Sequence, residues 1–111
     1  MLKIVFIASL FLISNAAYSA AGDWSPYSKI SNIFIEGNDT VAIATITFAT
    51  NIPDSYKNND CLSNYITIDL SNEKGKSMYS LILAARLADK EVRVTLPFCS
   101  GPRPLVHQLN L

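Results

Sequence analysis

Residues 65–96 read YITIDLSNEKGKSMYSLILAARLADKEVRVTL, and the expected fold follows from this stretch. In residues 65–70 polar and apolar side chains alternate, as they do on a half-buried β-strand. One face of that strand carries Ile66, Ile68 and Leu70, and the other carries Tyr65, Thr67 and Asp69. Residues 91–96 alternate in the same way, with Val92, Val94 and Leu96 opposite Glu91, Arg93 and Thr95. The stretch therefore predicts two strands with a different element between them.

That intervening element is a predicted helix. Ser71 or Asn72 can cap its N-terminus, and Glu73 places a negative charge in its first turn. Apolar residues then recur at the spacing of one helix face, at Met78, Leu81, Ile82 and Ala85. Further apolar side chains widen this surface toward the end of the helix, at Leu83, Ala84, Leu87 and Ala88. We therefore expect the helix to be mostly covered, by the sheet and, in an assembly, by another subunit. Asp89 and Lys90 then turn the chain.

Two strands are predicted before this stretch. Residues 29–36 are rich in Ile and Phe, and residues 40–50 are a long β-branched run without Gly or Pro. Gly37, Asn38 and Asp39 separate them and tolerate the positive φ angles of a tight hairpin turn. Residues 51–64 contain Pro and several Asn and Asp, which predicts a long loop.

After the second alternating segment, residues 97–104 (PFCSGPRP) are predicted to form a rigid loop, and residues 105–111 a last strand. Leu105, Leu109 and Leu111 would share one face of that strand. The predicted order is β-β-β-α-β-β, which is the element order of an OB-fold. We therefore expect a mostly β protein with one helix, built as a five-stranded OB-fold-like barrel. Other α+β arrangements share this composition and stay open.

Residues 1–21 are typical of a secretory signal peptide. Lys3 provides a short positive start, residues 4–13 are an apolar run, and small residues follow it. Cleavage fits after Ser19 or after Ala21. The apolar run is short for a membrane span of about 20 residues, so we expect removal of the segment rather than a membrane anchor. A single domain, residues 22–111, would remain in a secreted or periplasmic protein.

Cys61 and Cys99 are the only cysteines. In an oxidising compartment we expect them to form a structural disulfide. The bond would close a loop of about 39 residues and contribute about 3–4 kcal/mol to stability. The two cysteines do not have the close spacing of a zinc site, and the single His107 could not complete one. We therefore expect no metal.

Charge and motifs narrow the range of expected functions. The chain has nine basic and nine acidic residues, and neither a basic stripe for nucleic acid nor a polybasic membrane patch is present. His107 has no recognisable nucleophile partner, and we expect it at the rim of the core. The carboxylates Asp54, Asp60, Asp69 and Glu73 are scattered. No phosphate-binding loop or nucleophile elbow occurs, so we expect neither an enzyme nor a cofactor.

Aromatic residues in polar segments are better candidates for binding. Trp24, Tyr27 and Tyr56 could stack on a sugar or a partner, or could pack over the ends of the barrel. In OB-folds the loops after strands one and four and the faces of strands two and three form the ligand site. Together with Gly37, the candidate ligand-binding residues are Asn38, Asp39, Tyr56, Tyr65, Thr67, Ser100 and Arg103.

Residues 77–96 (SMYSLILAARLADKEVRVTL), the following Cys-containing loop and residues 104–106 resemble the C-terminal part of a bacterial toxin family. The family comprises the receptor-binding B subunits of the subtilase-cytotoxin and pertussis-like group. The shared pattern is a Tyr-containing apolar helix, a short turn, Val-Arg-Val, a Pro-bearing loop and a final strand. It covers about thirty-five residues.

The resemblance implies an OB barrel, a pentameric ring with the helix lining its pore, and binding of sialylated glycans. It also implies a toxin A subunit as a partner. No sugar-contacting residue of the family can be placed on this chain, and the mature chain is shorter than the toxin subunits. From the predicted signal peptide and the resemblance, we expect a secreted module that binds a cell-surface glycan or glycoprotein receptor. The alternative is a secreted or periplasmic accessory protein that binds another protein and has no glycan activity.

Overall fold

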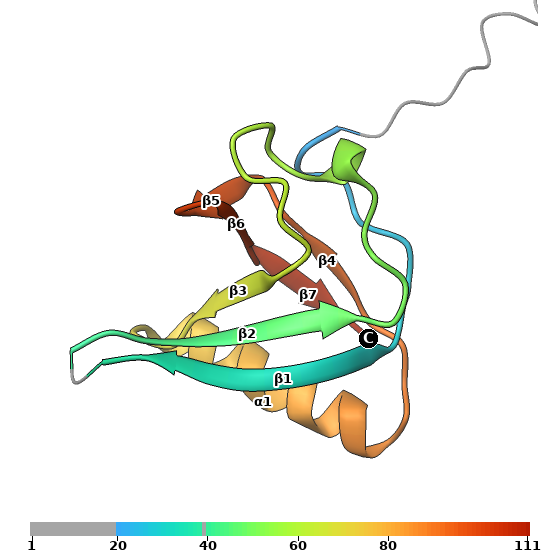
Figure 1. Cartoon of the computed structure of the whole chain (residues 1–111). Coiled ribbons are helices and arrows are strands. Elements are labelled where there is room, and N and C mark those ends of the chain that lie inside the picture. Colours follow the sequence, from blue (N-terminus) through green and yellow to red (C-terminus); the bar gives the residue numbers. More distant parts are fainter. Residues whose placement is uncertain (1–19, 39) are drawn as a thin grey trace, which may run out of the picture.

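The computed structural model describes residues 20–38 and 40–111, so residues 1–19 of the predicted signal segment 1–21 lie outside the described residues, as does Asp39. The chain is mostly β with one helix (Figure 1). Strands β1 (Ile30–Gly37) and β2 (Ala42–Phe48) form the predicted antiparallel hairpin, whose tip projects beyond the other strands. Gly37 has φ +132°, and a Cβ there would lie 1.9 Å from the carbonyl oxygen of Val41. The hairpin turn therefore requires glycine at this position.

Strand β3 (Ile66–Asp69) pairs antiparallel with β2, and helix α1 (Glu73–Leu87) follows it. The side chain of Asn72 caps α1 by accepting a hydrogen bond from the Gly75 amide at 2.7 Å. This helix packs against the sheet through Gly75, Met78, Ile82 and Ala85.

The predicted helix face needs two corrections. Leu81 is 45% exposed, because the buried stripe continues from Met78 to Ile82 and Ala85 along one side of the helix axis. The sheet also covers less of the helix than expected, and cover by another subunit stays a prediction. Leu83 is 39% exposed and Leu87 is 89% exposed, because both face away from the sheet.

Residues 97–104 form a hairpin rather than the predicted rigid loop. Strand β5 (Phe98–Ser100) pairs antiparallel with β6 (Arg103–Leu105), and Gly101 takes φ +61° at the turn between them. Strand β6 runs parallel to β3, with Leu105 opposite Thr67. The two strands have three residues each and residues 97–104 contain three prolines, so the segment shows no alternation that would predict a hairpin.

The predicted last strand is divided. Leu105 ends β6, whereas β7 (Gln108–Asn110) pairs antiparallel with β4 (Arg93–Thr95) in a separate two-stranded sheet. Two consecutive amides explain the break: Val106 N–H donates to the Thr67 carbonyl at 2.9 Å, and His107 N–H donates to the Thr95 carbonyl at 3.0 Å. The chain thus changes partner from β3 to β4 within two residues.

The larger sheet has the order β1-β2-β3-β6-β5 and is open, with β1 and β5 at its edges. Ser28, just before β1, bridges Val92, just before β4, by two backbone hydrogen bonds of 2.9 Å. Between the sheets and α1 lies the hydrophobic core, which includes Ala44, Ile46, Ile66, Ile68, Ile82, Val92, Val94 and Leu96.

Residues 49–65 form the predicted long connection, which contains only a short 3-10 helix, η2 (Asp54–Tyr56). The expected disulfide joins Cys61 in this connection to Cys99 in β5, with 5.7 Å between the Cα atoms. Lys57 is buried here, and its ammonium group donates to Asn64 Oδ1 at 2.9 Å, Asp54 Oδ1 at 3.2 Å and the Leu62 carbonyl at 3.3 Å. No helix in the described ranges is long and apolar enough to cross a membrane.

Candidate functional site

The face of the larger sheet opposite the core, which we call the outer face, carries a continuous row of side chains across four strands. The pairing registers place Phe34, Thr45, Thr67 and Leu105 side by side on β1, β2, β3 and β6. Thr45 and Thr67 are both fully buried although they lie on this face. Neighbouring side chains therefore cover the centre of the outer face, at Thr45 and Thr67.

An ion pair provides part of that cover. Arg103 on β6 donates to Glu36 Oε1 on β1, and Thr45 Oγ1 donates to the same carboxylate at 2.7 Å. The Arg103 guanidinium also lies 5.4 Å from the ring centroid of Tyr65, whose ring meets Phe34 edge-on at 6.3 Å. Hydrogen bonds from Arg103 and Thr45 hold the pKa of Glu36 below its ordinary value of 4.5. Both charges of this cluster are therefore already paired within the chain.

Beside the cluster, toward the tip of the β1–β2 hairpin, lies a concave region of about 480 Å³, which we call the outer groove. Three parts of the chain build it: the hairpin turn with β2, the end of β3, and the β5–β6 hairpin. It is lined by Thr40, Val41, Ile43, Asp69, Ser71, Cys99, Ser100 and Leu105. Its apolar side chains are Val41, Ile43 and Leu105, and hydroxyl groups and one carboxylate surround them. Such a combination is common in small-molecule sites.

Asp69 provides the carboxylate of the outer groove. Its Oδ1 atom accepts from the Ser71 hydroxyl at 2.6 Å and from the Ser71 amide at 2.8 Å. These two hydrogen bonds lower the pKa of Asp69 from its ordinary value of 3.8. Oδ2 accepts no hydrogen bond from any residue in the described ranges. The carboxylate is therefore ionised at neutral pH, with one oxygen available to a ligand.

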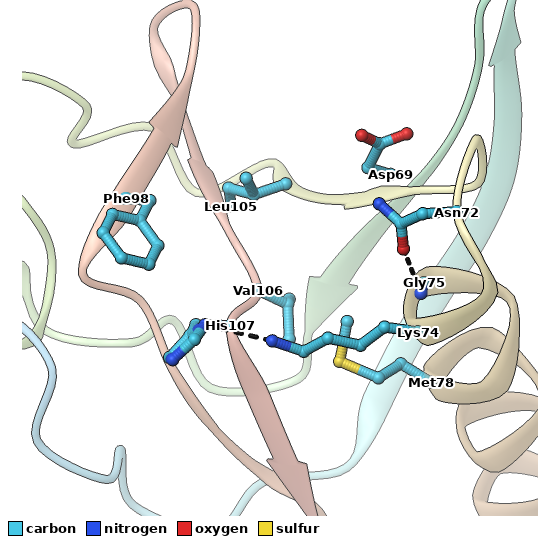
Figure 2. A pocket seen from close by; sticks show the side chains of 9 residues that line it. All are labelled: Asp69, Asn72, Lys74, Gly75, Met78, Phe98, Leu105, Val106 and His107. Carbon is cyan, nitrogen blue, oxygen red and sulfur yellow. Dashed lines mark hydrogen bonds between the residues drawn. The ribbon is translucent and has the colours of Figure 1, made fainter.

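A smaller cavity of about 120 Å³, which we call the inner pocket, lies between the start of α1 and the β5–β6 hairpin and shares Asp69 and Leu105 with the outer groove. Figure 2 shows Lys74 reaching across this pocket to His107, with 3.1 Å between Lys74 Nζ and His107 Nδ1. The His107 ring also meets Phe98 edge-on at 5.1 Å. His107 is half-buried at this rim, as expected from the sequence.

The predicted ligand residues are only partly brought together. Tyr65 and Arg103 lie in the outer-face cluster, and Ser100 lines the outer groove. Thr67 is fully buried in this chain and none of the described residues bonds to its hydroxyl, so direct contact of Thr67 with a ligand is not expected. Tyr56 is partly buried against the core and lines neither the outer groove nor the inner pocket, so its contact with a ligand stays a prediction.

The turn residues have structural roles. Asn38 Oδ1 accepts from Thr40 N at 2.9 Å, from Thr40 Oγ1 at 3.0 Å and from Val41 N at 3.0 Å. Asn38 therefore shapes the turn at one end of the outer groove, while Gly37 permits the backbone to close there. Asp39 lies outside the described residues, so its place in the site stays a prediction.

Trp24 and Tyr27 both contact a side chain of the domain itself. The Arg93 guanidinium lies 4.8 Å from the ring centroid of Trp24 and 4.9 Å from that of Tyr27. Both aromatic residues therefore pack on the domain's own arginine, at the end of the two-stranded sheet.

Of the residues that line the outer groove, the sequence predicted only Ser100 as a ligand candidate and missed Thr40, Val41, Ile43, Asp69, Ser71, Cys99 and Leu105. One signal was present: the alternation in residues 65–70 places Asp69 on the same face as Tyr65 and Thr67. The β5–β6 hairpin, which brings Leu105 to this face, left no such signal. Among the described residues no group of three or more His, Cys, Asp or Glu side chains could hold a metal ion.

Comparison of the chain with protein-family models, curated proteins and solved structures finds no match.

Proposed function

We propose that this chain is a secreted binding module that recognises a cell-surface glycan or glycoprotein receptor at the outer groove. The observation that supports the proposal is the composition of the groove, in which Val41, Ile43 and Leu105 lie beside the Asp69 carboxylate and three hydroxyl-bearing residues. Sugars present both apolar C–H faces and hydroxyl groups, so a groove of this mixed character suits them. The groove also lies between the two loops and the strand face expected of an OB-fold ligand site.

The proposal includes an OB-type barrel like that of the toxin B subunits. The order β-β-β-α, followed by further strands, supports it, and so does the bridge between Ser28 and Val92, which links the lead-in to β1 with the start of β4. In this view β6 and β7 are two halves of the fifth barrel strand, divided where the chain changes its partner. The segment 1–21 acts as the secretion signal in the same proposal.

A glycan array probed with the purified mature domain tests this function. Val41→Ser and Ile35→Ser form a matched pair, because both side chains are about half exposed (51% and 54%) on the same hairpin and only Val41 lines the groove. We expect saturable glycan binding by the wild-type domain. Val41→Ser should weaken this binding, and Ile35→Ser should leave it unchanged. A well-folded domain that binds no glycan would contradict the proposal, and so would equal binding by both variants.

A second candidate function is supported by the exposed leucines of α1. Leu83 and Leu87 lie within one turn of each other on the outward side of the helix and are 39% and 89% exposed, and neighbouring exposed apolar side chains favour a protein-binding surface. The partner would be a second copy of the chain, as in a pentameric ring with a toxin A subunit, or another protein served by an accessory factor. Light scattering on the purified domain separates these arrangements, since a strict monomer at high concentration excludes the ring.

A further inference from the structure

The charges around the outer groove bear on the kind of sugar it would accept. Among its eight lining residues, Asp69 alone has a charged side chain. Arg103 and Lys74, the cations of the neighbouring elements β6 and α1, do not line the groove. Arg103 pairs with Glu36 and Thr45, and Lys74 extends into the inner pocket toward His107. Figure 2 shows the Asp69 carboxylate pointing away from that pocket, on the opposite side from Lys74 and His107. A ligand in the outer groove would therefore meet a negative charge and no available positive charge.

From this arrangement we infer that the outer groove binds a neutral hexose, and that a sialylated glycan is excluded. This inference rests on the proposed glycan-binding function and specifies its ligand. The free Oδ2 atom of Asp69 accepts hydrogen bonds from sugar hydroxyls, and hydrogen bonds to an ionised acceptor are the stronger kind. The C–H face of the ring packs on Val41, Ile43 and Leu105, while the hydroxyls of Thr40, Ser71 and Ser100 complete the polar rim.

The exclusion of an anionic sugar follows from the same geometry. A sialic acid carboxylate placed in the groove would lie close to Asp69 without a cation to compensate for its lost hydration. Juxtaposed like charges are a common means of rejecting a wrong ligand.

The test compares one glycan in two forms: an oligosaccharide that ends in neutral galactose, and the same oligosaccharide capped with sialic acid. The wild-type domain should bind the neutral form, and the cap should weaken binding at least about tenfold. Asp69→Asn keeps the shape of the side chain and an acceptor for Ser71 but removes the charge. It should weaken binding of the neutral form about tenfold and reduce the discrimination against the capped form. Glu91→Gln is the control, since Glu91 is exposed and lines none of these cavities.

The outcomes separate this inference from the proposed function. Tight binding of the capped form that Val41→Ser weakens would overturn the neutral-hexose inference but leave glycan binding at the groove intact. Unchanged binding of the neutral form by Asp69→Asn would also overturn it. Preferential binding of an amino sugar would contradict it in favour of a cationic ligand. Absence of binding to any glycan would overturn the proposed function itself.

Discussion

The guanidinium carbon of Arg93 lies 4.8 Å from the ring centroid of Trp24. Tyr27 holds the same guanidinium at 4.9 Å and donates its hydroxyl to Asn110 Oδ1 at 3.2 Å. Through these contacts residues 24–27, which precede β1, pack against both strands of the two-stranded sheet, β4 and β7. Backbone hydrogen bonds continue this attachment, because the amide of Ser25 donates to the Val94 carbonyl at 2.9 Å.

Arg93→Ala should therefore loosen the lead-in segment without opening the core. Loss of the two cation–π contacts should lower the free energy of unfolding by about 1–2 kcal/mol. Chemical denaturation measures this loss, and Trp24 fluorescence should change in the folded state, because Trp24 loses its neighbour. Arg86→Ala, on the exposed side of α1, is the control. Equal stabilities of the two variants would contradict a structural role for Arg93.

The Glu36–Arg103 pair predicts a pH dependence. The pKa of Glu36 is lowered in the folded chain by hydrogen bonds from Arg103 and Thr45, so the unfolded chain takes up this proton first as the pH falls. Its contribution is fully present above the ordinary pKa of 4.5 and is lost as the pH falls through the folded-state value. Glu36→Gln should flatten the acid side of the curve of unfolding free energy against pH. An unchanged acid limb would show that the pair adds no stability.

Gly75 marks a close approach between α1 and β3. A Cβ at this position would lie 1.6 Å from the Asp69 carbonyl oxygen, which is backbone and cannot move independently. Gly75→Ala should therefore lower the unfolding free energy by about 3 kcal/mol, although alanine favours helix by about 1 kcal/mol. Ser80→Ala, on the exposed side of the same helix, should be nearly neutral. A Gly75→Ala domain as stable as wild type would mean that helix and strand are farther apart.

Buried Lys57 stabilises the connecting segment 54–64 through hydrogen bonds. Its fully buried ammonium group donates three hydrogen bonds, to Asp54, Leu62 and Asn64. Lys57→Met retains the apolar stem but leaves these acceptors without a donor, which should lower the unfolding free energy by about 1–3 kcal/mol. Thermal denaturation measures this loss. Lys90→Met, at an exposed position, is the control and should have little effect. Equal melting temperatures would argue against this role for the ammonium group.

The Cys61–Cys99 disulfide should also contribute to stability, because Cys61 lies in the same connection, residues 49–65. Cys61 and Cys99 are 38 residues apart in sequence, and replacing both with Ala should cost about 3–4 kcal/mol on the chain-entropy model. The change should also loosen the β5–β6 hairpin and the outer groove, because Cys99 belongs to both. Thermal melts with and without reductant measure the effect, and identical melts would contradict it.

Local patterns were enough to predict several elements. The alternation in residues 65–70 identified β3 and the core positions Ile66 and Ile68, and Gly37 marked the hairpin turn. The disulfide followed from cysteine count and expected compartment. These features depend on side-chain periodicity or on backbone freedom at single positions, and both are written within a few neighbouring residues.

Only the tertiary structure decided which residues form the outer groove. Its residues come from segments 40–43, 69–71 and 99–105, which meet because β6 pairs parallel with β3 and Cys99 is bonded to Cys61. Long-range pairing also decided that Thr67 is buried and that Trp24 lies against Arg93. The sequence by itself determined where β1 to β4 and α1 form, because periodicity acts locally. Which side chains share a surface depends on contacts between distant segments, and these appear only in the folded chain.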